Sequence, residues 1–143
     1  MNRSEELRKA LIAAERARES GEDSKAVRIL QDAATRASIA ENPDSGHERL
    51  HGEICLRLAG LLEDADRLPE SMQAYQEAAD SYGRAPGSEA EASFCARKIV
   101  SGVKEMWRRP DRLYLLIARI DRERRQLDER PGSEIEPGRL ALP

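Results

Sequence analysis

The chain has 143 residues, of which 36% are charged and 3% aromatic, and its formal net charge is −3. This length fits one domain. No apolar run approaches the roughly 18–20 residues of a membrane-spanning helix, and Glu5 and Glu6 stand where a secretion signal needs an apolar segment. We therefore expect a cytoplasmic protein without a membrane partner. Abundant Ala, Leu, Glu and Arg, with few β-branched or aromatic residues, favour an all-α fold over a sheet.

The first expected helices cover about residues 4–20 and 23–41. Ser4 can cap the first helix, and Gly21 ends it. The second helix ends before Asn42-Pro43, a pair typical of breaks. Apolar residues recur with helical period in both segments: Leu7, Ala10, Leu11, Ala14 and Ala17, then Ala26, Val27, Leu30, Ala33, Ala34 and Ala37.

The next two helices are expected at about 47–66 and 69–82. The first opens after Asp44-Ser45-Gly46, and Pro69 suits the first turn of the second. Gly83, Pro86 and Gly87 end the pair. The apolar stripes are Leu50, Ile54, Cys55, Leu58, Leu61 and Leu62, then Met72, Tyr75, Ala78, Ala79 and Tyr82.

A third pair is expected at about 88–108 and from Pro110 to about 130. Its stripes are Ala92, Ala96, Ile99, Val100, Val103, Met106 and Trp107, then Leu113, Leu116, Ile117, Ile120 and Leu127. From Pro131 on the periodicity stops, so residues 131–143 are predicted to be a flexible tail behind a helical domain of residues 1–130. Short links within each pair predict three antiparallel hairpins.

The first two pairs can be superimposed. Cys55, Leu58, Ala59, Leu62, Asp66, Ser71, Tyr75 and Ala78 have the same offsets as Ala10, Ala13, Ala14, Ala17, Gly21, Ala26, Leu30 and Ala33. This spacing resembles the tetratricopeptide repeat (TPR), over residues 7–85. The third pair matches less well, because Trp107 stands at the turn glycine and Arg112 at the small residue. The alternative is a generic six-helix bundle.

The resemblance implies a right-handed superhelix and a role in protein–protein recognition. In TPR proteins the first helices of successive pairs line a groove that receives a peptide or helix. Carried over by offset, the partner-binding positions are Arg8, Leu11 and Glu15, then Glu53 and Leu56, then Phe94, Arg97 and Lys104. We expect a non-catalytic adaptor or scaffold whose partner has acidic and apolar residues. An array of three pairs has exposed terminal faces, and a homo-oligomer that covers them is a possible arrangement.

One motif points to a different function. His47-Glu48-Arg49-Leu50-His51 reads H-E-x-x-H, in which two imidazoles on one helix face hold Zn²⁺ and the Glu activates water. The motif opens a helix, and no third His follows it, so a third ligand would have to be a carboxylate such as Glu70 or Glu77. We expect a solvated helix N-terminus, no metal, no cofactor and no enzymatic activity. A zinc-dependent metallopeptidase or a metal-binding protein that uses His47, Glu48 and His51 is the alternative.

Charge is unevenly distributed along the sequence. Residues 41–91 carry a net charge of −8 and residues 97–125 one of +6. The basic cluster lacks interleaved aromatic residues, so we expect an acidic partner or an acidic neighbouring pair rather than nucleic acid. Cys55 and Cys95 both lie inside helical patterns and are expected to be buried. An obligate structural subunit of a larger complex is the remaining alternative.

Overall fold

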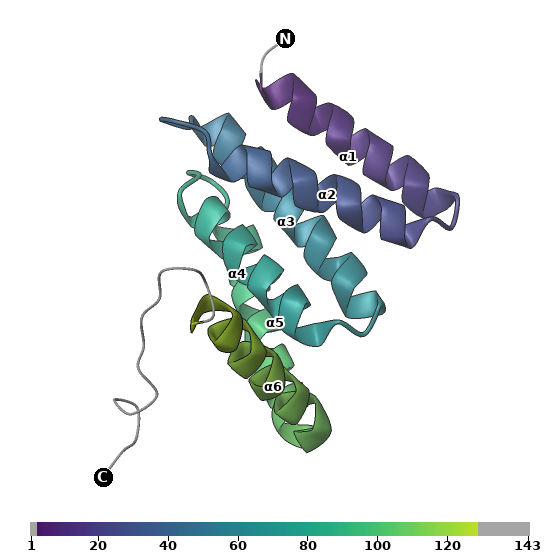
Figure 1. Cartoon of the computed structure of the whole chain (residues 1–143). Helices are drawn as coiled ribbons and strands as arrows, with labels where there is room; N and C mark the ends of the chain where they lie inside the picture. Colours follow the sequence, from purple (N-terminus) through teal and green to yellow (C-terminus); the bar gives the residue numbers. More distant parts are fainter. Residues whose placement is uncertain (1–2, 129–143) are drawn as a thin grey trace. The chain divides into compact units, whose positions relative to one another are not determined.

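The computed structural model describes residues 3–128, and within that range it contains six α-helices and no strand (Figure 1). The all-α prediction is confirmed. The helices begin and end close to the predicted positions, whereas the predicted tail, residues 131–143, lies outside the described residues. The helices are α1 Arg3–Glu19, α2 Asp23–Ser38, α3 Ser45–Asp64, α4 Leu68–Gly83, α5 Glu89–Arg108 and α6 Pro110–Asp128.

The residues between the helices end or start them through their backbone conformation and hydrogen bonds. Gly21 has a φ of +76°, in the left-handed region that glycine adopts without strain, and it lies two residues after Glu19, the last residue of α1. Asp44 caps α3, because its Oδ1 accepts a hydrogen bond of 2.7 Å from the backbone N–H of His47. Pro69 lies in the first turn of α4, where a missing N–H removes no helical hydrogen bond. The predicted breaks are therefore found where the sequence places them.

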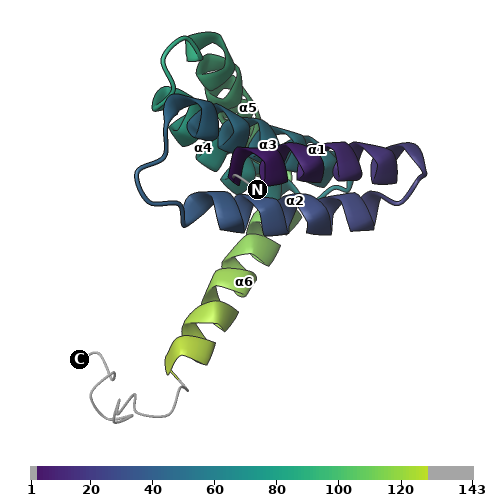
Figure 2. The same ribbon diagram turned by 90° about the horizontal axis from the view of Figure 1, so that it is seen from above.

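The chain divides into two compact units, and the boundary lies between Lys104 and Glu105. The first unit holds α1 to α4 and most of α5. In it α1 packs against α2, α3 packs against α4, and α3 also contacts both α1 and α2 (Figure 2). The second unit holds the end of α5 and α6.

The core of the first unit is built from the predicted stripes. Leu30, Ile54, Cys55 and Leu62 are almost completely buried, as are the small residues Ala14, Ala26, Ala59 and Ala78. The Ser71 hydroxyl, also buried, donates a hydrogen bond of 2.8 Å to the Ala59 carbonyl oxygen. Small side chains at these positions let α3 and α4 approach closely enough for that bond, which fixes their packing.

Several apolar residues predicted for the stripes of the third pair are exposed instead. On α5 these are Val100, Val103 and Trp107, the last of them 72% exposed. Ile117, Ile120 and Leu127 on α6 are exposed as well. None of the helices in residues 3–128 combines the length and the apolar content that crossing a bilayer requires.

Candidate functional site

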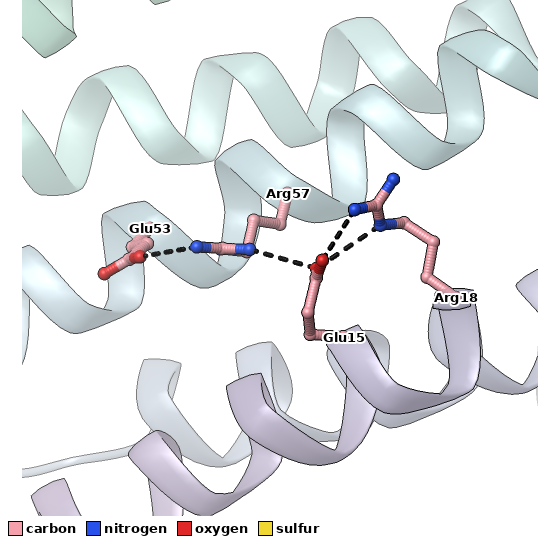
Figure 3. A network of polar contacts seen from close by, with 4 residues as sticks. All are labelled: Glu15, Arg18, Glu53 and Arg57. Carbon is pink, nitrogen blue, oxygen red and sulfur yellow. Dashed lines mark hydrogen bonds and ion pairs between the residues drawn. The ribbon is translucent and has the colours of Figure 1, made fainter. Parts of the chain in front are cut away.

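A chain of four charged side chains joins α1 to α3 (Figure 3). Arg57 lies between two carboxylates, with Nη1 3.3 Å from Glu15 Oε2 and Nη2 3.2 Å from Glu53 Oε1. Arg18 forms a second, shorter pair with Glu15, at 2.6 Å. The hydrogen bond from Arg18 is the main cause that lowers the pKa of the Glu15 carboxyl, so this group stays ionised at neutral pH. The four residues link neighbouring faces of α1 and α3.

A cavity of about 250 Å³ adjoins this chain of charges. Its apolar walls come from Ala14, Leu30 and Leu61, the first two of them buried. Its polar lining comes from Glu15, Arg18, Arg57 and Asp64. Gly60 completes the lining, and a Cβ added there would meet nothing within 4 Å. The cavity therefore combines an apolar interior with charged groups of both signs.

The structure brings together some of the predicted partner-binding residues. Glu15 and Glu53 are joined through Arg57, a residue that the sequence reasoning missed. Its position four residues after Glu53 on one helix was the available signal. Leu11 and Leu56 are half-buried and pack against the core, and Arg8 is exposed. Phe94, Arg97 and Lys104 are exposed along α5.

The H-E-x-x-H segment is buried, so the expectation of a solvated helix N-terminus is wrong. His47, Glu48 and His51 are each only 6% exposed. The burial has a physical reason, because the first turns of α3 pack under α2 and α4 and each polar side chain finds a partner there. His47 Nε2 lies 3.0 Å from the Ala37 carbonyl oxygen at the end of α2. A carbonyl only accepts hydrogen bonds, so this nitrogen carries a hydrogen.

The other two motif residues turn to different partners. Arg84 Nε donates to Glu48 Oε2 at 3.0 Å, and His51 Nδ1 lies 3.1 Å from the Ser81 hydroxyl on α4. Burial lowers the pKa of His51, so its ring is neutral at neutral pH. Glu70, one of the two suggested third ligands, pairs with Arg67 at the start of α4. This arrangement does not turn His47, Glu48 and His51 toward one shared ion.

A second polar cluster links α3, α4 and α5. Lys98 donates to Glu63 Oε1 at 2.8 Å, and the Tyr75 hydroxyl donates to Glu63 Oε2 at 2.7 Å. Lys98 also lies 5.8 Å from the centre of the Tyr75 ring, within cation–π range. Partial burial alone would raise the pKa of Glu63, but the hydrogen bonds from Lys98 and Tyr75 outweigh burial and lower it. Here a basic residue of the third pair meets the acidic second pair of the same chain.

Comparison with known proteins gives no match to this chain among family models, curated proteins or solved structures.

Proposed function

We propose that the chain is a small non-catalytic adaptor, similar to TPR domains, that binds a protein partner at the face shared by α1 and α3. The partner segment carries acidic and apolar residues, and the encounter takes place in the cytoplasm. The remaining positions of the binding surface lie on α5, at Phe94, Arg97 and Lys104. The observation that carries the proposal is the cavity between α1 and α3 with its charged lining.

The lining supports this class of partner. The walls formed by Ala14, Leu30 and Leu61 accommodate an apolar side chain, whose burial contributes roughly 25 cal/mol per Å² of apolar surface. Arg57 and Arg18 stand beside the cavity and present forked donors that match a carboxylate. An aliphatic residue next to Asp or Glu in an extended or helical segment meets both requirements.

The contacts of the H-E-x-x-H segment support a non-catalytic role. A metallopeptidase needs both imidazoles on one ion and a carboxylate aimed at the water that attacks. Here His47 is bonded to the end of α2, and Glu48 forms an ion pair with Arg84. In the proposal these two residues tie α3 to its neighbours.

The test begins with a pull-down from the native host on immobilised full-length protein, followed by affinity measurements with the partner identified. Gly60→Leu should fill the cavity and weaken binding at least tenfold. Gly60→Ala is the matched control, because it makes the same backbone change and adds only one carbon. Leu56→Glu should also weaken binding while the circular dichroism spectrum stays helical.

The opposite pattern would overturn the proposed site. If Gly60→Leu and Leu56→Glu bind normally while Arg119→Glu combined with Arg122→Glu does not, the partner binds α6 instead. Peptidase activity that disappears in Glu48→Gln would overturn the non-catalytic assignment.

A further inference from the structure

One ring nitrogen of His51 has no hydrogen-bond partner. The residue is 6% exposed and its Nε2 is enclosed, yet that atom has no hydrogen-bond partner among the described residues. The other nitrogen, Nδ1, is already paired with the Ser81 hydroxyl. Leaving a buried polar atom unpaired costs about 1–3 kcal/mol, so such an atom needs an explanation.

Two further metal-binding side chains lie beside this ring. Cys55 follows His51 by one turn on the same face of α3, and Glu77 reaches across from α4. One potential ligand atom from each of the three residues lies within 4.8 Å of the others. His51 and Cys55 are buried, whereas Glu77 is exposed, so the carboxylate is the member of the cluster that meets solvent.

The distances are close to those of a zinc centre. Zn–S and Zn–O bonds of about 2.3 and 2.1 Å at a tetrahedral angle place sulfur and oxygen about 3.6 Å apart. The Cys55 Sγ and Glu77 Oε2 atoms are 3.3 Å apart. The three ligand atoms lie within 4.8 Å of one another, so a zinc centre requires them to approach by up to about 1 Å.

We propose that His51, Cys55 and Glu77 form a site for a transition-metal ion of the Zn²⁺ class, with water as the fourth ligand. His51 binds through Nε2, and its Nδ1–H then donates to Ser81. The Cys55 thiol loses its proton to solvent as the metal–sulfur bond forms. A mixed set of nitrogen, sulfur and oxygen suits Zn²⁺ or Co²⁺ and excludes Mg²⁺ and Ca²⁺, which prefer oxygen alone.

The proposed site is not the H-E-x-x-H site with its two histidines. It uses His51 but replaces His47 and Glu48 by Cys55 and Glu77, and it departs from the sequence expectation of no metal. The Cys55 thiol donates to Glu77, so of these three side chains His51 is the one with an enclosed, unpaired atom, Nε2. The Ser81 hydroxyl, completely buried, lies 3.1 Å from Nδ1 and orients the ring.

The test is a titration of the reduced, full-length protein with Co²⁺ and then with Zn²⁺. Co²⁺ should bind one per chain and give the near-ultraviolet thiolate-to-cobalt absorption, and Zn²⁺ should displace it. Glu77→Gln, a change at an exposed residue, should weaken Co²⁺ binding at least tenfold without unfolding the protein. Cys55→Ser should abolish the thiolate band. Ser81→Ala should weaken binding by the roughly 10–100-fold typical of a lost supporting hydrogen bond.

Matched controls change residues of the same kind outside the site. They are His47→Gln, Cys95→Ser and Asp80→Asn, the last one turn beyond Glu77 on α4, and each should bind Co²⁺ like the unaltered chain. Absence of a thiolate band, or a band and affinity that survive in Glu77→Gln, would overturn the proposal. A loss confined to His47→Gln would do the same and would return the metal to the H-E-x-x-H pair.

Discussion

Leu58 shows how much a single side chain of the core contributes. It is 7% exposed and belongs to the buried cluster that α3 shares with the helices around it. Leu58→Ala removes buried apolar surface and leaves a cavity, so we expect a loss of ~2–5 kcal/mol in the free energy of unfolding. Urea denaturation followed by circular dichroism measures it. Ile12→Ala on α1, a 53% exposed position, is the control and should change stability by less than ~0.5 kcal/mol.

Glu63 makes stability depend on pH in the acid range. Its pKa in the folded state is lowered, because hydrogen bonds from Lys98 and Tyr75 outweigh the opposing effect of burial. The unfolded chain therefore binds a proton at higher pH than the folded one, and the stabilisation is present above ~4.3, the value of an unperturbed Glu. It is lost as pH falls through the lower folded pKa.

Glu63→Gln should accordingly flatten the pH dependence of the unfolding free energy below pH ~4.3. Denaturant titrations at several pH values measure this. Asp80→Asn, the corresponding carboxylate-to-amide change at an exposed residue of α4 that accepts a hydrogen bond from Gln76, is the control. An unchanged slope in Glu63→Gln would contradict the assignment to this residue.

The sequence predicts the burial of single residues well where the helical spacing of apolar residues alone determines which residues face the core. Leu62 and Tyr75 are buried as the stripe predicts, at 2% and 4% exposure. His51 lies on that same stripe, four residues before Cys55, but its polar character favoured a solvated interpretation. Its burial depends on Ser81, 30 residues later, and no local pattern indicates a partner at that separation. The same holds for Arg57 and Glu15, which are 42 residues apart.

Two of the three glycines of α3, Gly52 and Gly60, have opposite expected behaviour. A Cβ added at Gly52 would lie 3.0 Å from three ring atoms of Tyr82, which is itself buried, whereas Gly60 faces open space. We expect Gly52→Ala to destabilise the protein by ~1–2 kcal/mol, because overpacking exceeds the gain in helix propensity. Gly60→Ala should stabilise it by ~0.5–1 kcal/mol.

Thermal and urea unfolding of the two variants decide this prediction. The substitutions are chemically identical and lie on one helix, so each serves as the control for the other. Equal stabilisation by both would mean that the Tyr82 ring moves aside without cost, and that the close approach of α3 to that ring does not limit packing.

Helix positions follow from the sequence because the breaks are local. Gly21, Asp44 and Pro69 act through the conformation and hydrogen bonds of their own turn. The burial of the apolar residues in the third helix pair was less predictable. Val100, Val103 and Trp107 have helical spacing, yet they are exposed, since period alone does not state whether a partner covers the stripe. Which helices pack together also depends on contacts between distant residues, such as Ser71 with Ala59.

Charge is unevenly distributed along the chain: residues 41–91 carry a net charge of −8 and residues 97–125 a net charge of +6. Some of these opposite charges pair within the chain, because Lys98 forms an ion pair with Glu63. Arg97 and Lys104 are exposed on the same helix, seven residues and therefore about two turns apart on one face. On the proposed function they attract the acidic part of the partner before the apolar contacts form. Long-range attraction of this kind raises the association rate more than it raises the lifetime of the complex.

Reversing both charges, as Arg97→Glu with Lys104→Glu, should slow association with the partner and flatten its dependence on salt. Dissociation should change little, because neither side chain lies in the cavity between α1 and α3. Stopped-flow or surface-plasmon measurements at several ionic strengths separate the two rates. Arg119→Glu with Arg122→Glu is the matched reversal on α6. If that pair removes the salt dependence and the α5 pair does not, α6 guides the encounter, and the assignment of Arg97 and Lys104 to the binding surface is wrong.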